Sequence, residues 1–231
     1  MLLSVNIQEA GYSRQFPTLK NLRFSVSPGE LVGLIGPNGA GKSTTVKSIM
    51  GIIHHFKGDI DVNEYAYIPE RPIFYAQLTL WEHIDFLFST LATTDETAFF
   101  QKAHELLDLF NLSAAAHSYP ERFSKGMQQK MMLVLAFLKQ AKLYLVDEPF
   151  MGLDPKAVKK LLLKLEEEKE AGAGILMSTH VLDTAEKICD RFILISGGKL
   201  IVQGTLNDIR KLSHLKNGSL LDCFDALTED Y

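Results

Sequence analysis

A glycine-rich stretch that ends in a lysine and two hydroxyl residues is the clearest place for chemistry in this chain. It runs from Gly36 to Thr44 and fits the pattern Gly-x4-Gly-Lys-Ser/Thr of phosphate-binding loops. Glycines allow backbone N–H groups to surround phosphates, and a lysine adds a full positive charge. A plain glycine-rich turn would not require lysine and serine at these places. The residues of this predicted nucleotide site are Gly36, Pro37, Asn38, Gly39, Ala40, Gly41, Lys42, Ser43 and Thr44.

Two adjacent carboxylates, Asp147 and Glu148, follow the apolar run Leu143–Val146. An Asp-Glu-Pro sequence is often a surface turn, but two acids at the end of a buried strand cost free energy unless they serve a cation. We predict that Asp147 binds Mg²⁺ together with Ser43 of the phosphate loop. Glu148 is expected to orient or deprotonate the attacking water, because phosphoryl transfer depends on positioning and on a proton acceptor.

The elements that must position these residues follow from three short apolar runs, Leu31–Ile35, Leu143–Val146 and Ile175–Met177. Each run ends at a glycine or a polar cluster, which is typical of buried parallel strands. Helical patterns follow them, and the best marked begins at Asp154-Pro155 and ends near Gly172. This order predicts an α/β core in which helices cover both faces of a mostly parallel sheet.

Three other regions have different patterns. Apolar and polar residues alternate in Leu3–Glu9 and Arg23–Val26, which predicts an antiparallel β layer. From Ile73 to Gln140 the spacing is helical, and we expect a helical insertion between two core strands. The tail Thr205–Tyr231 is also expected to be helical.

The composition of the chain argues against several classes of protein. The 231 residues are 46% hydrophobic, enough for a sizeable core, and the net charge of −4 does not attract the chain to nucleic acid or to an anionic membrane. No apolar run approaches the roughly 20 residues of a membrane-spanning helix. The N-terminus does not resemble a secretion signal, and two cysteines without metal-ligand spacing favour a reducing cytoplasm.

Along nearly its whole length the sequence resembles the ABC transporter ATPase family. Gly36–Thr44 resembles the Walker A loop of that family and Leu143–Glu148 its Walker B strand. Gly152–Asp154 is similar to the D-loop, and Phe123–Lys130 to the signature, which usually reads Leu-Ser-Gly-Gly-Gln. The resemblance implies a RecA-like P-loop NTPase core with an antiparallel β layer and a helical subdomain, and ATP and Mg²⁺ as cofactors.

The resemblance also implies residue roles. His180 matches the histidine that holds the γ-phosphate, although a histidine at a strand end often makes an ordinary hydrogen bond. Tyr12 corresponds to the aromatic residue that stacks on adenine, and covering the β layer is an equally open role. Asp154 is expected to communicate across a subunit interface and also to cap a helix. The residues expected to contact the ATP of a partner subunit are Ser124, Lys125, Gly126 and Met127.

The chain departs from the family pattern at three positions. Glu70 stands where the family has the Q-loop glutamine, and we expect it to face Mg²⁺ directly or through water. Lys125 and Met127 replace a glycine and the glutamine of the signature, and Lys125 is expected either to approach phosphate or to be solvated. The sequence resembles Ecs-type bacterial ABC exporter ATPase subunits in the stretches Tyr67–Pro72, Phe123–Lys130 and Asp147–Phe150, and the resemblance implies that Glu70 and Lys125 are family traits. The short stretch Gly58–Tyr67 is expected to form a tight hairpin.

We therefore expect a single ABC ATPase domain over residues 1–231. Within it, residues 1–72 and 141–204 are predicted to form the core with its β layer, 73–140 the helical signature subdomain, and 205–231 a helical tail.

The leading functional hypothesis is the ATPase subunit of an exporter at the cytoplasmic face of the membrane. Its expected partners are a second ATPase subunit, identical or different, and an integral membrane permease held near Glu70–Leu80. Direct binding of nucleic acid is not expected. One alternative is a soluble ABC ATPase acting on DNA or the ribosome, which predicts a heptad insertion, two phosphate loops or a basic face. Another is a regulatory nucleotide-binding module without turnover; a GTPase would need an Asn-Lys-x-Asp motif, which is absent.

Overall fold

The computed structural model describes residues 1–62, 64–91 and 95–228. The chain forms two compact units: one contains residues 1–65, 142–148 and 168–231, and the other contains residues 66–141 and 149–167. This grouping differs from the sequence-based division at residues 66–72 and 141 and, most of all, in the segment 149–167, all of which lie with the helical residues. Contacts within that unit explain the difference, because Lys160 donates to the carbonyl of Leu109, and the Nζ of Lys164 lies 5.9 Å from the ring centroid of Phe137.

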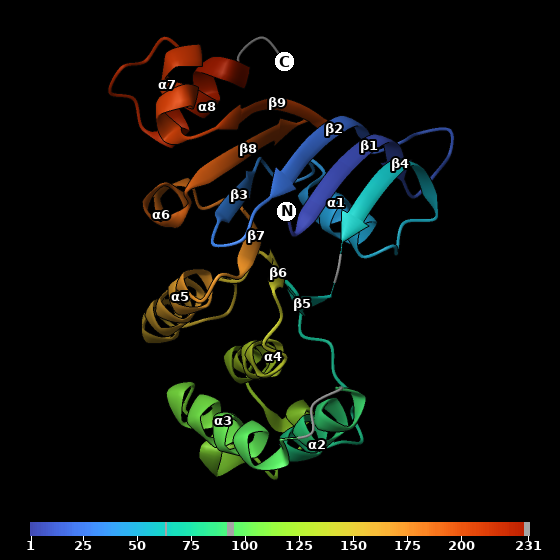
Figure 1. The fold of residues 1–231 in the computed structure, drawn as a ribbon, viewed down its shortest axis with the longest axis vertical. Coiled ribbons are helices and arrows are strands. Elements are labelled where there is room, and N and C mark those ends of the chain that lie inside the picture. The colour runs from blue at the N-terminus through green and yellow to red at the C-terminus, as the bar shows by residue number, and fades with distance from the viewer. Residues whose placement is uncertain (63, 92–94, 229–231) are drawn as a thin grey trace. The chain divides into compact units, whose positions relative to one another are not determined.

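The first unit is built on a twisted sheet with two kinds of strand pairing (Figure 1). In sheet order its strands are β4 (His55–Val62), β1 (Leu3–Gly11), β2 (Leu19–Val26), β9 (Lys199–Gly204), β8 (Arg191–Ser196), β3 (Leu31–Ile35), β7 (Gly174–Thr179) and β6 (Leu143–Asp147). Strand β3 pairs in parallel with β7 and β8, and β6 pairs in parallel with β7. Strand β1 pairs antiparallel with β2 and β4. The predicted mostly parallel core and antiparallel layer are confirmed.

Burial explains the two strand patterns. Every residue of β3, β6 and β7 is buried, as continuous apolar runs require. The solvent-facing layer instead alternates, as in β4. Helix α1 (Lys42–Ile49) follows β3 and contacts strands of both parts of the sheet, β1 and β4 as well as β6 and β7. Its N-cap, Gly41, has φ of 105°, and a Cβ there would lie 2.5 Å from Leu19; only glycine suits this turn.

The expected hairpin at Gly58–Tyr67 is wrong. Strand β4 pairs with β1, and it is not a sheet neighbour of β5 (Tyr65–Ile68). The physical reason lies in the register, which places Gly58 opposite Ile7 at a point where the two backbones approach closely. A Cβ at Gly58 would collide with the carbonyl oxygen of Asn6. The shortness of this stretch suggested a hairpin, but Gly58 lies inside β4 at a tight contact with β1.

The second unit is helical, as predicted for most of its length. Its helices are α2 (Leu80–Thr90), α3 (Glu96–Leu109), the short 3₁₀ turns η1 (Ser113–Ala115) and η2 (Pro120–Arg122), α4 (Lys125–Leu138) and the first part of α5 (Pro155–Glu170). Local chemistry sets the helix starts. Thr79 and Glu82 form a capping box at α2, Asp95 caps α3, and Ser124 caps α4.

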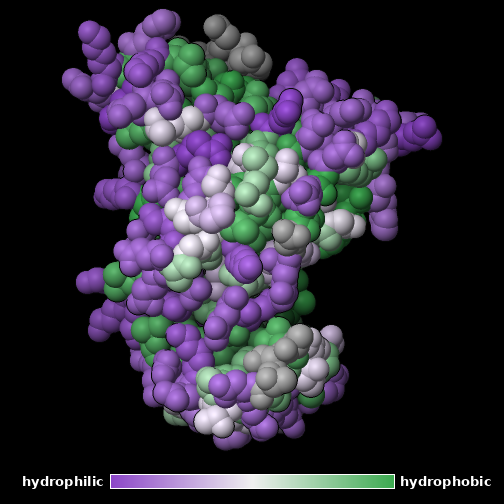
Figure 2. Space-filling view, viewed as in Figure 1, coloured by the Kyte–Doolittle hydropathy of each residue, from purple (hydrophilic) through white to green (hydrophobic). Residues whose placement is uncertain are grey.

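Three C-terminal helices complete the first unit: α6 (Leu182–Ile188), α7 (Leu206–Leu212) and α8 (Leu220–Thr228). Ile209 and Leu220 are fully buried against Phe192 and Leu194 of β8. Figure 2 shows hydrophobic surface over α7 and α8, where Leu212 and Leu221 are exposed. Helices α7 and α8 lie within the predicted helical tail, whose residues 229–231 are outside the described ranges. Over the described ranges, no helix combines the length and the hydropathy needed to cross a membrane.

Candidate ATP site

The phosphate loop joins β3 to α1. Its buried lysine, Lys42, folds back to contact the start of the same loop. The Nζ of Lys42 donates to the carbonyl oxygens of Gly36 at 2.8 Å and Pro37 at 3.2 Å. It also lies 3.2 Å from the Oε1 of Glu148, and the two side chains are 6% and 9% exposed. A buried ion pair of this kind neutralises both charges. The lysine is therefore held by acceptors that an incoming phosphate must replace.

Glu148 is held in an unusual backbone conformation directly after β6. Its φ of 46° falls in the left-handed region, which costs a non-glycine residue about 1–3 kcal/mol. The backbone N–H of Glu148 donates to the carbonyl of Ser178 at 3.0 Å. Its carboxylate contacts Lys42 through Oε1 and the Nδ1 of His180 through Oε2, at 2.9 Å. The structure thus brings together the three predicted catalytic residues.

The predicted metal ligands Ser43 and Asp147 also lie side by side. The Oγ of Ser43 donates to the Oδ1 of Asp147 at 3.3 Å. Ser178 of β7 donates its hydroxyl to the same oxygen, and Asp147 is almost fully buried. Sequence reasoning missed Ser178, although its place directly after the apolar run Ile175–Met177 was a usable signal. Hydroxyl and carboxylate oxygens are the ligands that suit Mg²⁺.

Protein side chains alone do not form a complete metal cage here. Among the described residues, no group of three or more His, Cys, Asp and Glu side chains is placed to hold a metal. Magnesium in nucleotide sites is normally held by one or two protein ligands, with phosphates and waters supplying the rest. Glu70, the third predicted ligand, belongs to the helical unit, and its approach to the metal stays a prediction.

The tip of the phosphate loop faces solvent. Pro37, Asn38 and Gly39 are exposed at its tip. The turn is closed by the N–H of Ala40, which donates to the carbonyl of Pro37 at 3.1 Å. Helix α1 begins directly behind it, so its positive dipole end points towards the loop. This arrangement suits an anion.

Tyr12 stands at the end of the β1 region with its side chain 69% exposed. Its hydroxyl accepts a hydrogen bond from the Nζ of Lys47 at 3.2 Å, and that Nζ lies 5.8 Å from the ring centroid. An aromatic side chain that covered the β layer would lose most of its exposure. The open ring therefore favours stacking on a base, which stays a prediction.

In the helical unit, the signature residues occupy the start of α4. Ser124 accepts a hydrogen bond from the N–H of Met127 at 3.3 Å, and both Ser124 and Lys125 are exposed. Gly126 packs closely against the D-loop, because a Cβ there would lie 2.7 Å from the carbonyl of Gly152. A pocket of about 540 Å³ adjoins these residues, lined by Glu70, Arg71, Pro72, Lys125, Gln128, Gln129, Met151 and Gly152.

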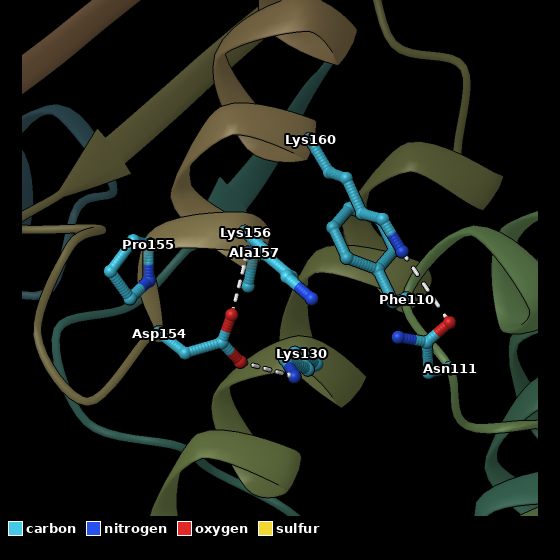
Figure 3. A pocket seen from close by; sticks show the side chains of 8 residues that line it. All are labelled: Phe110, Asn111, Lys130, Asp154, Pro155, Lys156, Ala157 and Lys160. Atoms are coloured by element: carbon cyan, nitrogen blue, oxygen red, sulfur yellow. Dashed lines mark hydrogen bonds and ion pairs between the residues drawn. The ribbon is translucent and has the colours of Figure 1, made fainter.

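Asp154 caps α5 and pairs with the signature helix (Figure 3). One carboxylate oxygen accepts from the N–H of Ala157 at 2.9 Å, and the other accepts from the Nζ of Lys130 at 2.9 Å. The hydrogen bond from Lys130, followed by that from Ala157, lowers the pKa of Asp154 to about 2. The cap expected from the sequence is present.

Asp154 also lines a second pocket, of about 430 Å³, towards which Lys130, Lys156 and Lys160 extend (Figure 3). Two of these lysines are already engaged within the unit. Lys130 pairs with Asp154, and Lys160 reaches the Oδ1 of Asn111 at 3.4 Å.

Comparisons with known proteins agree with this geometry. Residues 19–151 match the family described as ABC transporter. The ABC transporter ATP-binding protein YthP of Bacillus subtilis, described as uncharacterized, is 54% identical over 96% of this chain and 95% of its own length. The ABC-type transporter ATP-binding protein EcsA of the same organism is 41% identical over 99% of this chain and 97% of its own length.

Solved structures are similar as well. A structure described as the ATP-binding subunit of an ABC transporter superposes with a TM-score of 0.93 at 41% identity, covering 99% of this chain and 100% of that chain. A dimeric ATP-binding cassette in a post-hydrolysis state with ADP and Pi shares the fold, with a TM-score of 0.78 at 21% identity over 89% of this chain and 99% of that chain. The chain is therefore an ATP-binding, ATP-hydrolysing member of the ABC transporter family.

Proposed function

We propose that this ATPase works as a pair of subunits attached to a separate membrane subunit, and that it drives export. The observation that carries the catalytic part of the proposal is the chain of contacts from Lys42 through Glu148 to His180. The three side chains belong to one unit and meet at the carboxyl ends of neighbouring strands and at the phosphate loop. This is where an α/β sheet binds its ligand.

The contacts suggest how binding prepares hydrolysis. The γ-phosphate of ATP supplies the acceptors that Lys42 otherwise finds in Glu148 and the loop carbonyls. Loss of the Lys42 contact frees the Glu148 carboxylate to accept a proton from the attacking water. His180 keeps hold of the other carboxylate oxygen and limits how the base can turn.

Ser43 and Asp147 would hold Mg²⁺, with Ser178 orienting the aspartate. When bound, the ion offsets negative charge on the phosphate oxygens. Glu70 is proposed to contribute an oxygen to the same ion from the helical unit.

The signature surface supports the paired arrangement. Ser124 and Lys125 are exposed at the start of a 14-residue helix, where unpaired N–H groups and the helix dipole favour an anion. We propose that Ser124, Lys125, Gly126 and Met127 contact the ATP held by a second subunit and that Asp154 lies at the same interface. The dimeric cassette with ADP and Pi described above is a relative in which two cassettes meet.

The attachment of the membrane subunit is proposed at the segment from Glu70 to Leu80. Ile73 and Tyr75 are 72% and 57% exposed there, which is unusual for large apolar side chains that follow each other so closely. The structure described as the ATP-binding subunit of an ABC transporter supports a partner chain, and EcsA is described as an ABC-type transporter ATP-binding protein.

Co-purification and vesicle transport test the proposal together. The tagged chain is expressed in its native cell type and purified from detergent-solubilised membranes, and the integral membrane protein bound to it is identified and reconstituted in liposomes. The expected result is Mg²⁺-dependent ATPase activity that the membrane subunit stimulates, and ATP-driven uptake into inverted vesicles. Glu148→Gln is the inactive control. Uptake into right-side-out vesicles only would reverse the direction, and absence of a bound membrane protein would remove the transport role.

A further inference from the structure

Helix α1 carries two lysines, and they reach two different parts of the nucleotide site. Lys42 is the first residue of the helix and contacts the phosphate loop. Lys47 lies five residues later, which displaces it about 7.5 Å along the helix axis, and its ammonium contacts Tyr12. One rigid element therefore sends one lysine towards the loop expected to bind phosphates and the other towards the ring expected to bind the base.

The contact between Lys47 and Tyr12 holds the ring by its edge. The Nζ lies 3.2 Å from the phenol oxygen and 5.8 Å from the ring centroid. An ammonium only donates, so the phenol oxygen is the acceptor. The distance to the centroid is close to the outer limit of about 6 Å for a cation–π contact, so the hydrogen bond is the main interaction. The cation lies beside the oxygen and leaves the faces of the ring available, in agreement with the 69% exposure of Tyr12.

The backbone near Tyr12 is fixed, but its side chain has little packing of its own. Gly11, the last residue of β1, approaches Thr18 so closely that a Cβ on Gly11 would lie 2.7 Å from the Thr18 nitrogen. An exposed tyrosine ring without support would occupy several rotamers. Lys47 is half-buried and follows the fully buried Val46, so its stem leaves a well-anchored helix. Its hydrogen bond restricts the ring to one orientation.

We infer that Lys47 is a positioning residue for base recognition, which holds the ring of Tyr12 so that an open face stacks on the adenine of ATP. This inference rests on the predicted role of Tyr12 as the residue that stacks on adenine. A ring that is ordered before ATP arrives loses less conformational entropy on binding. Loss of this order should weaken ATP binding about fivefold, the equivalent of about 1 kcal/mol. The effect is confined to ligands that carry a base.

Binding of ATP and of inorganic tripolyphosphate to the full chain tests this role, because both ligands carry three phosphates and only ATP carries a base. Titration calorimetry in the presence of Mg²⁺ measures both dissociation constants. Lys47→Met should raise the Kd of ATP about fivefold and leave that of tripolyphosphate unchanged. Lys47→Arg should stay close to the wild type, because a guanidinium keeps N–H donors.

Lys57→Met is the matched control, since this lysine of β4 is exposed and pairs with Glu9. It should bind both ligands like the wild type. An equal loss of affinity for ATP and tripolyphosphate in Lys47→Met would show that the lysine acts on the phosphates or on the fold of the loop. Either outcome would overturn the inference.

A double-mutant cycle asks whether Lys47 acts through Tyr12. Tyr12→Phe keeps the ring but removes the oxygen that accepts the hydrogen bond from Lys47. In the Tyr12→Phe background, Lys47→Met should therefore have no further effect on the ATP affinity. Effects of the two substitutions that simply add would mean that Lys47 acts on ATP independently of Tyr12, which also overturns the inference.

The roles of Tyr12 and Lys47 fail in different ways. Tyr12→Ala removes the ring and should weaken ATP binding about tenfold, the size of a lost stack between a base and an aromatic ring. If Tyr12→Ala binds ATP normally, the predicted stacking role fails and the inference fails with it. If Tyr12→Ala is impaired and Lys47→Met is not, the ring needs no support and the inference alone is overturned. Neither result alters the proposed pairing of subunits or the export role.

Discussion

The two regions that are proposed to share one ATP hold their charges in opposite ways. Around the phosphate loop, Lys42, Asp147 and Glu148 are each less than 8% exposed and contact other side chains of the same unit. At the signature, Ser124 and Lys125 are exposed to solvent. Buried charges must be satisfied locally, whereas exposed ones are stabilised by water until a ligand arrives. In the first region the charged side chains pair with one another before any ligand binds. In the second region the side chains are hydrated and available to bind an anion.

The largest effect is expected from removing Glu148, the proposed catalytic base beside the phosphate loop. Glu148→Gln should lower ATP turnover about 10²–10⁴-fold, because an amide cannot accept the proton of the attacking water. ATP binding should survive, and an ATP-bound dimer should accumulate on size-exclusion chromatography. Glu170→Gln, at the exposed end of α5, is the control. Normal turnover in Glu148→Gln would remove this residue from the base role.

The next change removes the cation of the same region. Lys42→Met should weaken ATP binding about 100-fold, as expected on losing a charged contact of about 3 kcal/mol. Titration calorimetry with the isolated subunit measures the affinity. Lys57→Met on the solvent-facing β4, where the lysine pairs with Glu9, is the matched control. Equal affinity in the two variants would mean that the phosphates lie away from Lys42.

A third change separates the two regions. Gly126→Ala places a methyl group 2.7 Å from the carbonyl of Gly152, and the resulting strain of about 1–3 kcal/mol should displace the signature surface. Turnover should fall about tenfold, yet ATP affinity of the isolated subunit should be unchanged because the phosphate loop belongs to the other unit. If ATP affinity falls in parallel with turnover, the proposal that the phosphate loop alone determines ATP binding by the isolated subunit is wrong.

Glu70→Gln tests whether a residue of the helical unit serves the metal. We expect ATPase activity to persist and the Mg²⁺ concentration for half-maximal activity to rise about threefold, since a carboxylate adds charge that an amide lacks. The comparison uses Mg²⁺ titrations of both proteins at fixed ATP. An unchanged metal response would place Glu70 away from the ion.

The smallest expected effect concerns Asp154. Its pKa of about 2 depends first on Lys130, so Lys130→Met should raise it towards the unperturbed value of about 3.9. The stabilising contribution of a depressed carboxyl pKa is complete above about pH 4 and is lost as pH falls through the folded-state value. Carboxyl carbon shifts measured by NMR between pH 3 and 5 should titrate in the variant but not in the wild type. Titration in both proteins would exclude the pairing.

Local patterns were sufficient for much of the fold. Leu31–Ile35, Leu143–Val146 and Ile175–Met177 are continuous apolar runs, so their burial as parallel strands could be predicted. The start of α5 at Pro155 follows from the Asp-Pro pair. The shortness of the stretch Gly58–Tyr67 misled the prediction, because a short segment is compatible both with a hairpin and with two strands that pair elsewhere in the sheet. Only the pairing partner distinguishes these two cases.

The sequence by itself determined the nature of the phosphate site, since loop, strand and helix are contiguous and their chemistry depends on residue type and spacing. The tertiary structure decided which groups satisfy one another across long stretches of chain. The pairing of Lys42 with Glu148, the support of Asp147 by Ser178, and the hydrogen bond from Lys47 to Tyr12 all belong to this second class. Such contacts depend on sheet order and helix packing, which no local spacing encodes.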